Sequence, residues 1–158
     1  MRVRIIIMLV FVGMDQQGKP QYAALRGINT DFIGEANGSD KNYSFSIPAE
    51  KMSEKMHVFE SAIDLLSYAT MQKLEGKEWR TEHLLSLAGV YQPDKRDKKI
   101  ANVPAALTRF LKEHSEVKEI VLHLDNDRTG RLATKDNPDG CTRKIPCERP
   151  ATNERKRL

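Results

Sequence analysis

The fold of this chain is decided by residues 120–127, IVLHLDND, in which an apolar run ends in the acidic residues Asp125 and Asp127. An earlier apolar run, residues 56–59, ends in the same way at Glu60. Short apolar runs of this kind are typical of buried parallel strands, whose carboxyl ends share one edge of a sheet. We therefore expect the three carboxylates to converge there. Such a site favours Mg²⁺, with Mn²⁺ as the alternative ion, and points to metal-dependent chemistry on phosphate esters.

Alternating strand and helix patterns fill the region between and around these runs. Apolar periodicity predicts helices over 62–74 and 103–111, with Asn102 as a plausible N-cap of the second, and a strand over 84–90. Strand, helix, strand, helix, strand in about 70 residues predicts an open α/β sheet of parallel strands flanked by helices.

The first third of the chain has a different pattern. Strand-like runs at 9–14 and 21–26 flank a glycine-containing loop and predict a β-hairpin. Residues 27–40 are rich in Gly, Asn and Asp and indicate a loop, and alternating apolar residues at 43–47 indicate one further strand. We therefore expect an antiparallel β appendage.

We expect three regions in all. These are an N-terminal β appendage at 1–55, an α/β core at 56–135 and an irregular, disordered tail at 136–158.

Composition sets looser limits. The 158 residues include 26 Lys and Arg against 22 Asp and Glu, a net charge of +4 that suits nucleic acid but also many ordinary enzymes. Cys141 and Cys147 have neither a zinc-pair spacing nor a disulfide framework. The cysteine usage makes a reducing cytoplasm the expected compartment, and no apolar run is long enough to cross a bilayer, so we expect no membrane contact.

Two strings together suggest a family. Residues 58–64, VFESAID, and residues 124–131, LDNDRTGR, resemble the toprim domain of bacterial primases, topoisomerases and related nucleases in residue types, order and spacing. Residues 85–90, LSLAGV, and 123–135 are more similar to toprim-like proteins of bacterial plasmids and integrative mobile elements. The resemblance covers residues 56–135 for the core.

The resemblance implies a set of functional residues. It places Glu60, Asp125 and Asp127 at the acidic positions of the family, and Gly130 at a glycine that commonly follows the aspartates. Asp125 and Asp127 would then hold Mg²⁺, and Glu60 would act as general acid or base or as a third metal ligand. The implied activity is Mg²⁺-dependent nucleotidyl transfer or phosphodiester cleavage on DNA, with a partner in the replication or transfer machinery of a mobile element.

The end of the chain departs from that pattern. After Lys135 a helix and another strand should follow, but residues 136–158 contain three prolines and only Ile145 and Leu158 as large aliphatic residues. We expect a chain that is truncated, or altered in reading frame, after Lys135. The second hypothesis is therefore a non-catalytic remnant or accessory module that binds DNA or a partner protein.

Other interpretations apply to the same residues. Ser61 and Asp64 form a Ser-x-x-Asp capping box, which we favour over a catalytic role for them. Asp125, Asp127 and Thr129 also match the nucleophile motif of haloacid-dehalogenase-type phosphatases, in which Asp125 would attack phosphorus. With Gly130 and an acidic residue at 136 they fit the spacing of an EF-hand Ca²⁺ loop, although the preceding segment has the pattern of a strand rather than a helix.

Further residues are weaker candidates. His123 lies two residues before Asp125, so in a strand it faces the same side; a core histidine is the simpler interpretation. His57, His83 and His114 lack paired metal-ligand spacing and are interpreted as surface or packing residues. The candidate accessory residues are Asp64, His123, Gly130 and Arg131. The candidate nucleic-acid contacts are Arg80, Lys95, Arg96, Lys98 and Lys99.

Overall fold

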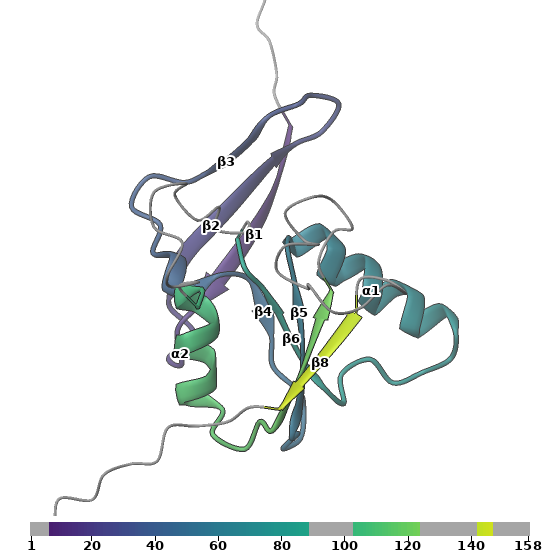
Figure 1. The fold of residues 1–158 in the computed structure, drawn as a ribbon. Coiled ribbons are helices and arrows are strands. Elements are labelled where there is room, and N and C mark those ends of the chain that lie inside the picture. The colour runs from purple at the N-terminus through teal and green to yellow at the C-terminus, as the bar shows by residue number, and fades with distance from the viewer. Residues whose placement is uncertain (1–6, 89–102, 124–141, 147–158) are drawn as a thin grey trace, which may run out of the picture.

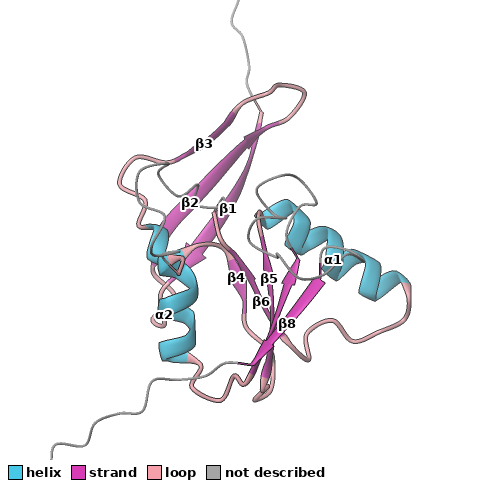
Figure 2. Ribbon diagram, viewed as in Figure 1, coloured by secondary structure: helices cyan, strands magenta, loops and turns pink. Residues whose placement is uncertain are grey.

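The computed structural model describes residues 7–88, 103–123 and 142–146. These residues form a five-stranded mixed sheet with a helix on each side, and a separate three-stranded antiparallel sheet beside it (Figures 1 and 2). The expected α/β class with an N-terminal β unit is confirmed.

The five-stranded sheet is built around a parallel centre. Its strands in spatial order are β4 (Ser46–Ile47), β6 (His83–Ser86), β5 (Lys55–Phe59), β7 (Glu119–His123) and β8 (Thr142–Pro146). β6, β5 and β7 are parallel, whereas β4 and β8 pair antiparallel at the two edges. All four residues of β6 and all but the first of β5 are buried, as expected for central strands covered on both faces. Three of these buried residues are polar, namely His57, His83 and Ser86.

Two helices cover opposite faces of this sheet. Helix α1 (Ala62–Leu74) packs on the face that carries Phe59 and Leu84, and α2 (Ala105–Glu113) packs on the face that carries Val58. The core beneath α2 contains Met56, Val58, Leu85, Ala106, Phe110, Val117 and Ile120. The core beneath α1 contains Phe59, Leu65, Ala69 and Leu84.

The boundaries of α1 follow from its sequence. The Ser61 side chain accepts a hydrogen bond from the Asp64 backbone N–H at 3.3 Å, and the Asp64 carboxylate accepts one from the Ser61 backbone N–H at 3.2 Å. This is the expected capping box. The helix ends before Gly76, whose φ of +73° is the left-handed conformation that glycine readily adopts after a helix.

The N-terminal sheet consists of β1 (Met8–Met14), β2 (Pro20–Gly27) and β3 (Ile33–Glu35). The β1–β2 hairpin is confirmed, but the expectation of a loop throughout 27–40 was wrong. β3 pairs with β2 by backbone hydrogen bonding, which a glycine- and asparagine-rich segment can supply without an apolar pattern of its own.

This sheet is fastened to the rest of the molecule at one end. A Cβ atom on Gly13 of β1 would lie 1.5 Å from the Tyr43 carbonyl oxygen, so only glycine allows so close an approach. The rings of Phe11 and Phe45 meet edge to face at 5.8 Å. Arg109 of α2 donates to the Asn42 carbonyl oxygen at 2.7 Å. The short 3₁₀ helix η1 (Lys41–Tyr43) therefore links both parts.

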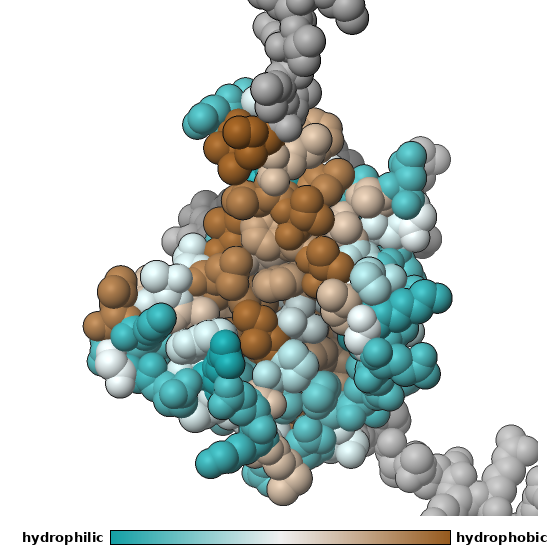
Figure 3. Space-filling model, turned by 180° about the vertical axis from the view of Figure 1, so that it is seen from behind, coloured by the Kyte–Doolittle hydropathy of each residue, from teal (hydrophilic) through white to brown (hydrophobic). Residues whose placement is uncertain are grey.

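Apolar side chains remain exposed on the N-terminal sheet, and Figure 3 shows them gathered on one side of the molecule. They are Ile7, Met8, Leu9, Val10, Ile28, Phe32 and Ile33. Patches of this kind mark interaction surfaces in many soluble proteins.

Several expected boundaries need correction. The strand expected at 43–47 is η1 followed by β4, and β4 pairs with β6 of the large sheet rather than with the hairpin. The second helix begins at Ala105 with Pro104 as its N-cap and without a side-chain cap, so Asn102 does not have that role.

The C-terminal region also differs from the expectation. Within 136–158, expected to be irregular, residues 142–146 form β8 along the free side of β7, with Ile145 opposite Ile120. An edge strand needs backbone pairing more than apolar side chains, which explains why composition missed it. Within the described residues, no helix is long and apolar enough to span a membrane.

Candidate functional site

The central parallel strands end together. Phe59, the last residue of β5, is aligned with Ser86 of β6 and with His123 of β7, and each of these residues ends its own strand. Glu60 follows β5 directly and therefore lies at the carboxyl edge of the sheet, where the sequence predicted it. Asp125, Asp127, Gly130 and Arg131 lie outside the described residues, so their convergence with Glu60 stays a prediction.

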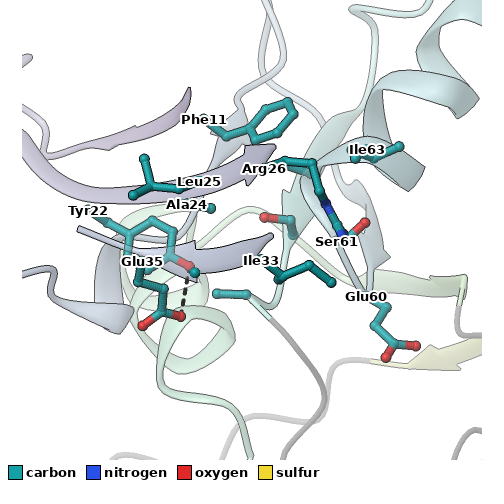
Figure 4. Close-up of a pocket in the computed structure, with 14 residues that line it drawn as sticks. Phe11, Tyr22, Ala24, Leu25, Arg26, Ile33, Glu35, Glu60, Ser61 and Ile63 are labelled. Atoms are coloured by element: carbon teal, nitrogen blue, oxygen red, sulfur yellow. Dashed lines mark hydrogen bonds between the residues drawn. The ribbon is translucent and has the colours of Figure 1, made fainter. Parts of the chain in front are cut away.

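Glu60 lines a cavity with a volume of about 490 Å³ between the two sheets. One wall comes from the N-terminal sheet, and the other from the carboxyl edge of β5 and β6 and the start of α1 (Figure 4). The lining residues are Phe11, Tyr22, Ala24, Leu25, Arg26, Ile33, Gly34, Glu35, Glu60, Ser61, Ala62, Ile63, Ser86 and Ala88. No pattern in the sequence indicates this cavity, because it depends on how the hairpin packs against the core.

The capping box forms the α1 side of this cavity. Ser61 lines it, while the Asp64 carboxylate is engaged by the Ser61 backbone N–H and, at 2.6 Å, by the Ser61 hydroxyl. These bonds hold the first turn of α1 beside Glu60. Asp64, which the sequence suggested as an accessory site residue, therefore stabilises the start of α1.

The far wall holds a paired tyrosine and glutamate. The Tyr22 hydroxyl donates to the Glu35 carboxylate at 3.0 Å, and Glu35 also forms an ion pair with Lys41 at 3.1 Å. Burial, together with the neighbouring Glu35 carboxylate, raises the pKa of Tyr22 above its usual value. Lys41 thus compensates the charge of Glu35, and Tyr22 stays neutral.

A chain of polar contacts runs along the α1 face of the sheet to the same edge. His57 Nε2 contacts the Glu82 carboxylate, and His57 Nδ1 lies 2.7 Å from Nε2 of His123. At its outer end, Lys55 donates to Glu82 at 3.0 Å. The ring of Tyr68 lies about 5 Å from the rings of both histidines and covers them.

The Glu82 carboxylate determines which nitrogen atoms of His57 and His123 carry protons. Burial lowers the pKa of His57, and burial followed by the nearby His57 lowers the pKa of His123 to about 4, so both rings are neutral at pH 7. Burial raises the pKa of Glu82, but the hydrogen bonds from Lys55 and His57 outweigh it, and the carboxylate stays ionised. A carboxylate only accepts, so His57 donates from Nε2 and accepts at Nδ1. His123 then donates from Nε2, which leaves the lone pair on its Nδ1.

The sequence did not reveal this chain. His123 was correctly placed on a strand, but His57 was interpreted as a surface or packing residue, and Lys55 and Glu82 had no assigned partners. The register of β5 against β7 brings together two histidines that are 66 residues apart, and only strand order could have indicated it.

A second histidine cluster lies at the opposite end of the parallel strands. His83 at the start of β6, His114 after α2 and Glu116 place one ligand atom each within 4.8 Å of one another, a His–His–Glu set of the kind that binds Zn²⁺. Sequence spacing gave no indication of it, since the set forms only when α2 packs over β6. The His83 side chain is 3% exposed.

Hydrogen bonding within this cluster opposes metal binding. His83 Nδ1 accepts the Ala49 backbone N–H at 3.1 Å, so the neutral ring carries its proton on Nε2, 3.5 Å from Glu116. Burial, together with His114, lowers the pKa of His83, which keeps that ring neutral. His114 Nδ1 lies 3.2 Å from the same Glu116 oxygen. A metal at Nε2 of His83 would require the Ala49 bond to break, so the arrangement suits a carboxylate bridging two rings.

The expected nucleic-acid contacts are only partly described. Arg80 is half exposed, pairs with Glu50 at 2.7 Å and lies over the Trp79 ring at 4.8 Å, and it does not line the cavity. Lys95, Arg96, Lys98 and Lys99 lie outside the described residues. β7 is a strand, as expected, and a helix–loop–helix EF-hand would need a helix there.

Comparison with known proteins assigns the family. A family model described as toprim-like matches residues 57–149, which is more than half of the chain and includes Glu60, the last three residues of β5 and all of β6 and β7. No curated protein and no solved structure is significantly similar to the chain. The match extends past Lys135, through β8, so the family region is longer than the sequence pattern indicated. The chain belongs to the toprim-like family, a family of nucleic-acid-processing domains.

Proposed function

We propose that this protein carries out Mg²⁺-dependent phosphoryl or nucleotidyl transfer, or phosphodiester cleavage, on DNA. The observation that carries the proposal is the position of Glu60, at the carboxyl edge of the parallel sheet and in the wall of a cavity, within the region that matches the family. Ligand sites of open α/β sheets lie at this edge.

Glu60 has the role of the proton-transfer group in this proposal. The Glu60 carboxylate takes a proton from an attacking hydroxyl or water, or returns one to the leaving oxygen, as a general acid or base. The alternative role for Glu60 is that of a third metal ligand. The capping box fixes the backbone on which Glu60 sits, so the carboxylate starts from a rigid position.

The donor set suits a hard cation. Glu60 offers carboxylate oxygens, and Asp125 and Asp127 follow β7 by two and four residues in the sequence. Oxygen ligands of this kind are those that Mg²⁺ and Mn²⁺ prefer. A bound Mg²⁺ would supply charge stabilisation for the phosphoryl oxygens.

Setting and partners belong to the same proposal. The similarity of residues 85–90 and 123–135 to proteins of plasmids and integrative elements supports a cytoplasmic protein that acts in the replication or transfer of a mobile element.

The test compares activity in matched variants. A 5′-labelled single strand, a nicked duplex and a primer–template are each incubated with Mg²⁺ and nucleoside triphosphates, and products are resolved by length. We expect the wild type to shorten or extend one of them, and Glu60→Gln and the double variant Asp125→Asn/Asp127→Asn to lose at least a hundredfold in rate. Glu75→Gln, an exposed glutamate after α1, is the matched control and should retain full activity.

Two results would contradict the proposal. One is a folded wild type that leaves all three substrates unchanged in Mg²⁺ and in Mn²⁺. The other is activity that survives in Glu60→Gln and in the double aspartate variant, which would place the chemistry elsewhere.

The second candidate is a non-catalytic accessory module. The exposed apolar residues of the N-terminal sheet favour it, because such a surface suits a partner protein. A Val10→Lys/Ile33→Lys variant that raises solubility and abolishes self-association, in a chain without catalysis, would support this candidate over the first.

A further inference from the structure

The cavity contains an arginine whose side chain has no partner among the described residues. Arg26 lies on β2, is half buried and lines the cavity, and its side chain makes no hydrogen bond or ion pair with any residue in 7–88, 103–123 or 142–146. The other arginines whose side chains the structure describes behave differently, since Arg80 pairs with Glu50 and Arg109 pairs with Glu113. A half-buried guanidinium without an anion is the feature that needs an explanation.

The direction of the Arg26 side chain explains why its guanidinium has no anion beside it. Figure 4 shows Arg26 extending from β2 across the cavity toward Ser61, at the start of α1. The first N–H groups of a helix have no intrahelical partner, and Ala62 and Ile63, which carry two of them, line the same cavity. An anion held by Arg26 would therefore also meet the favourable field of the α1 N-terminus.

Neither of the two glutamates that line the cavity, Glu35 and Glu60, pairs with Arg26. Glu35 of β3 is held by Lys41 and by the Tyr22 hydroxyl, so it is occupied away from the guanidinium. In Figure 4 the Glu60 side chain points away from β2 and β3. Arg26 thus remains available to an incoming ligand.

The remaining walls suit a flat or apolar group. Phe11, Ala24, Ile33 and Ile63 line the cavity, and its volume of about 490 Å³ is that of a small-molecule site. Aromatic and aliphatic side chains accept a nucleobase or sugar face without reading its sequence. A base within a duplex would not enter without being unstacked first.

We infer that the N-terminal sheet completes a nucleoside-phosphate pocket, in which Arg26 binds a phosphate group and the apolar wall receives the base or sugar. This inference names the ligand of the proposed function. It rests on that function only for the reaction that follows binding. Arg26 precedes the region that matches the family, so this part of the pocket is a property of the present chain. The phosphate belongs either to the end of a single strand or to a free nucleoside triphosphate.

Binding without metal tests the inference. The probe is a ten-nucleotide single-stranded DNA with a 5′-phosphate and a 3′-fluorophore, followed by anisotropy in EDTA, and the matched probe carries a 5′-hydroxyl. In a second arm, adenosine triphosphate competes with the phosphorylated strand. Preference for the 5′-phosphate identifies a strand end, whereas competition by the triphosphate with equal binding of both strands identifies a free nucleotide.

The variants then assign the effect to Arg26. Arg26→Gln, which keeps a polar side chain with N–H donors but loses the charge, should weaken binding of the phosphate-bearing ligand about tenfold to a hundredfold. Arg26→Lys should recover part of the loss, because lysine keeps the charge but not the bidentate geometry. Lys112→Gln removes an equal charge from an exposed position on α2, outside the cavity, and should bind within about twofold of the wild type.

The inference is overturned if Arg26→Gln and the wild type bind equally well while circular dichroism shows that both proteins are folded. Absence of binding by the folded wild type to either ligand would overturn it as well. Metal-dependent activity that persists in that case leaves the proposed function standing. Conversely, Arg26-dependent binding in a chain without activity supports the pocket and removes the proposed chemistry.

Discussion

His57 Nδ1 lies 2.7 Å from His123 Nε2, which joins the middle of β5 to the end of β7 through two neutral rings. The contact lies beneath Tyr68 of α1, and Glu82 fixes its direction from the other side of His57. The α1 face of the sheet therefore contains a polar chain where an apolar core would be expected.

The histidine chain predicts acid sensitivity. The pKa of His123 is about 4 in the fold and ordinarily near 6.5, so between these values the unfolded state binds more protons. The contribution of neutral His123 to the free energy of unfolding is therefore complete above about pH 6.5, and it is lost as the pH drops toward 4. Urea midpoints at pH 7.5, 6, 5 and 4.5 should show this decline.

The variant His123→Gln isolates that contribution. Glutamine offers an N–H donor to His57 but does not titrate, so the decline below pH 6.5 should become shallower by up to one proton. A pH dependence identical to that of the wild type would mean that His123 is not the group responsible.

Glu82 should matter more than an ordinary surface glutamate, because it accepts from both Lys55 and His57. Its side chain is 31% exposed, so we expect Glu82→Ala to lower the free energy of unfolding by about 1–2 kcal/mol. The control is Glu50→Ala, which breaks the exposed pair with Arg80 and should lower it by less than about 1 kcal/mol. Chemical denaturation of both variants would decide, and equal losses would contradict a special role for Glu82.

Gly13 should be the most sensitive glycine of the N-terminal sheet. A Cβ atom there would overlap the Tyr43 carbonyl, and neither backbone can move freely, so Gly13→Ala should destabilise by about 2–4 kcal/mol. Gly18→Ala meets no atom within 4 Å and suffers only from its φ of +76°, so about 1 kcal/mol is expected. Thermal denaturation measures both, and an equal shift would show that β1 and η1 are not in such close contact.

The sequence predicted best what is local. The capping box of Ser61 and Asp64 and the end of α1 before Gly76 depend on neighbouring residues, and Glu60 was placed correctly because it ends an apolar run. β3 and β8 were missed because each is defined by a partner strand rather than by its own apolar pattern.

The site was harder to predict, since it is assembled from distant segments. His57 and His123 meet only through the register of β5 and β7, and Arg26 extends toward Ser61 across a cavity that exists only once the hairpin has docked. No spacing in the sequence encodes those contacts. Packing of one unit on another has to be known first.

Asp64 separates a structural from a catalytic role. If it is a cap, Asp64→Ala should lower the free energy of unfolding by about 1 kcal/mol and leave the activity per folded molecule within about twofold of the wild type. Ser61→Ala is the matched change on the other side of the box and should give a similar loss of stability. A hundredfold loss of activity in folded Asp64→Ala, with Ser61→Ala active, would instead place Asp64 in the reaction.

Metal binding should depend on the aspartates and not on the histidine cluster. Calorimetric titration of the purified chain with Mg²⁺, and then with Mn²⁺, should give saturable binding that the double variant Asp125→Asn/Asp127→Asn abolishes, because these ions bind proteins chiefly through one or two carboxylates. His114→Ala removes one member of the set with His83 and Glu116 and should leave that binding unchanged, since the Ala49 N–H already occupies His83 Nδ1. Loss of Mg²⁺ binding in His114→Ala, with the double aspartate variant still binding, would move the metal to the opposite end of the strands.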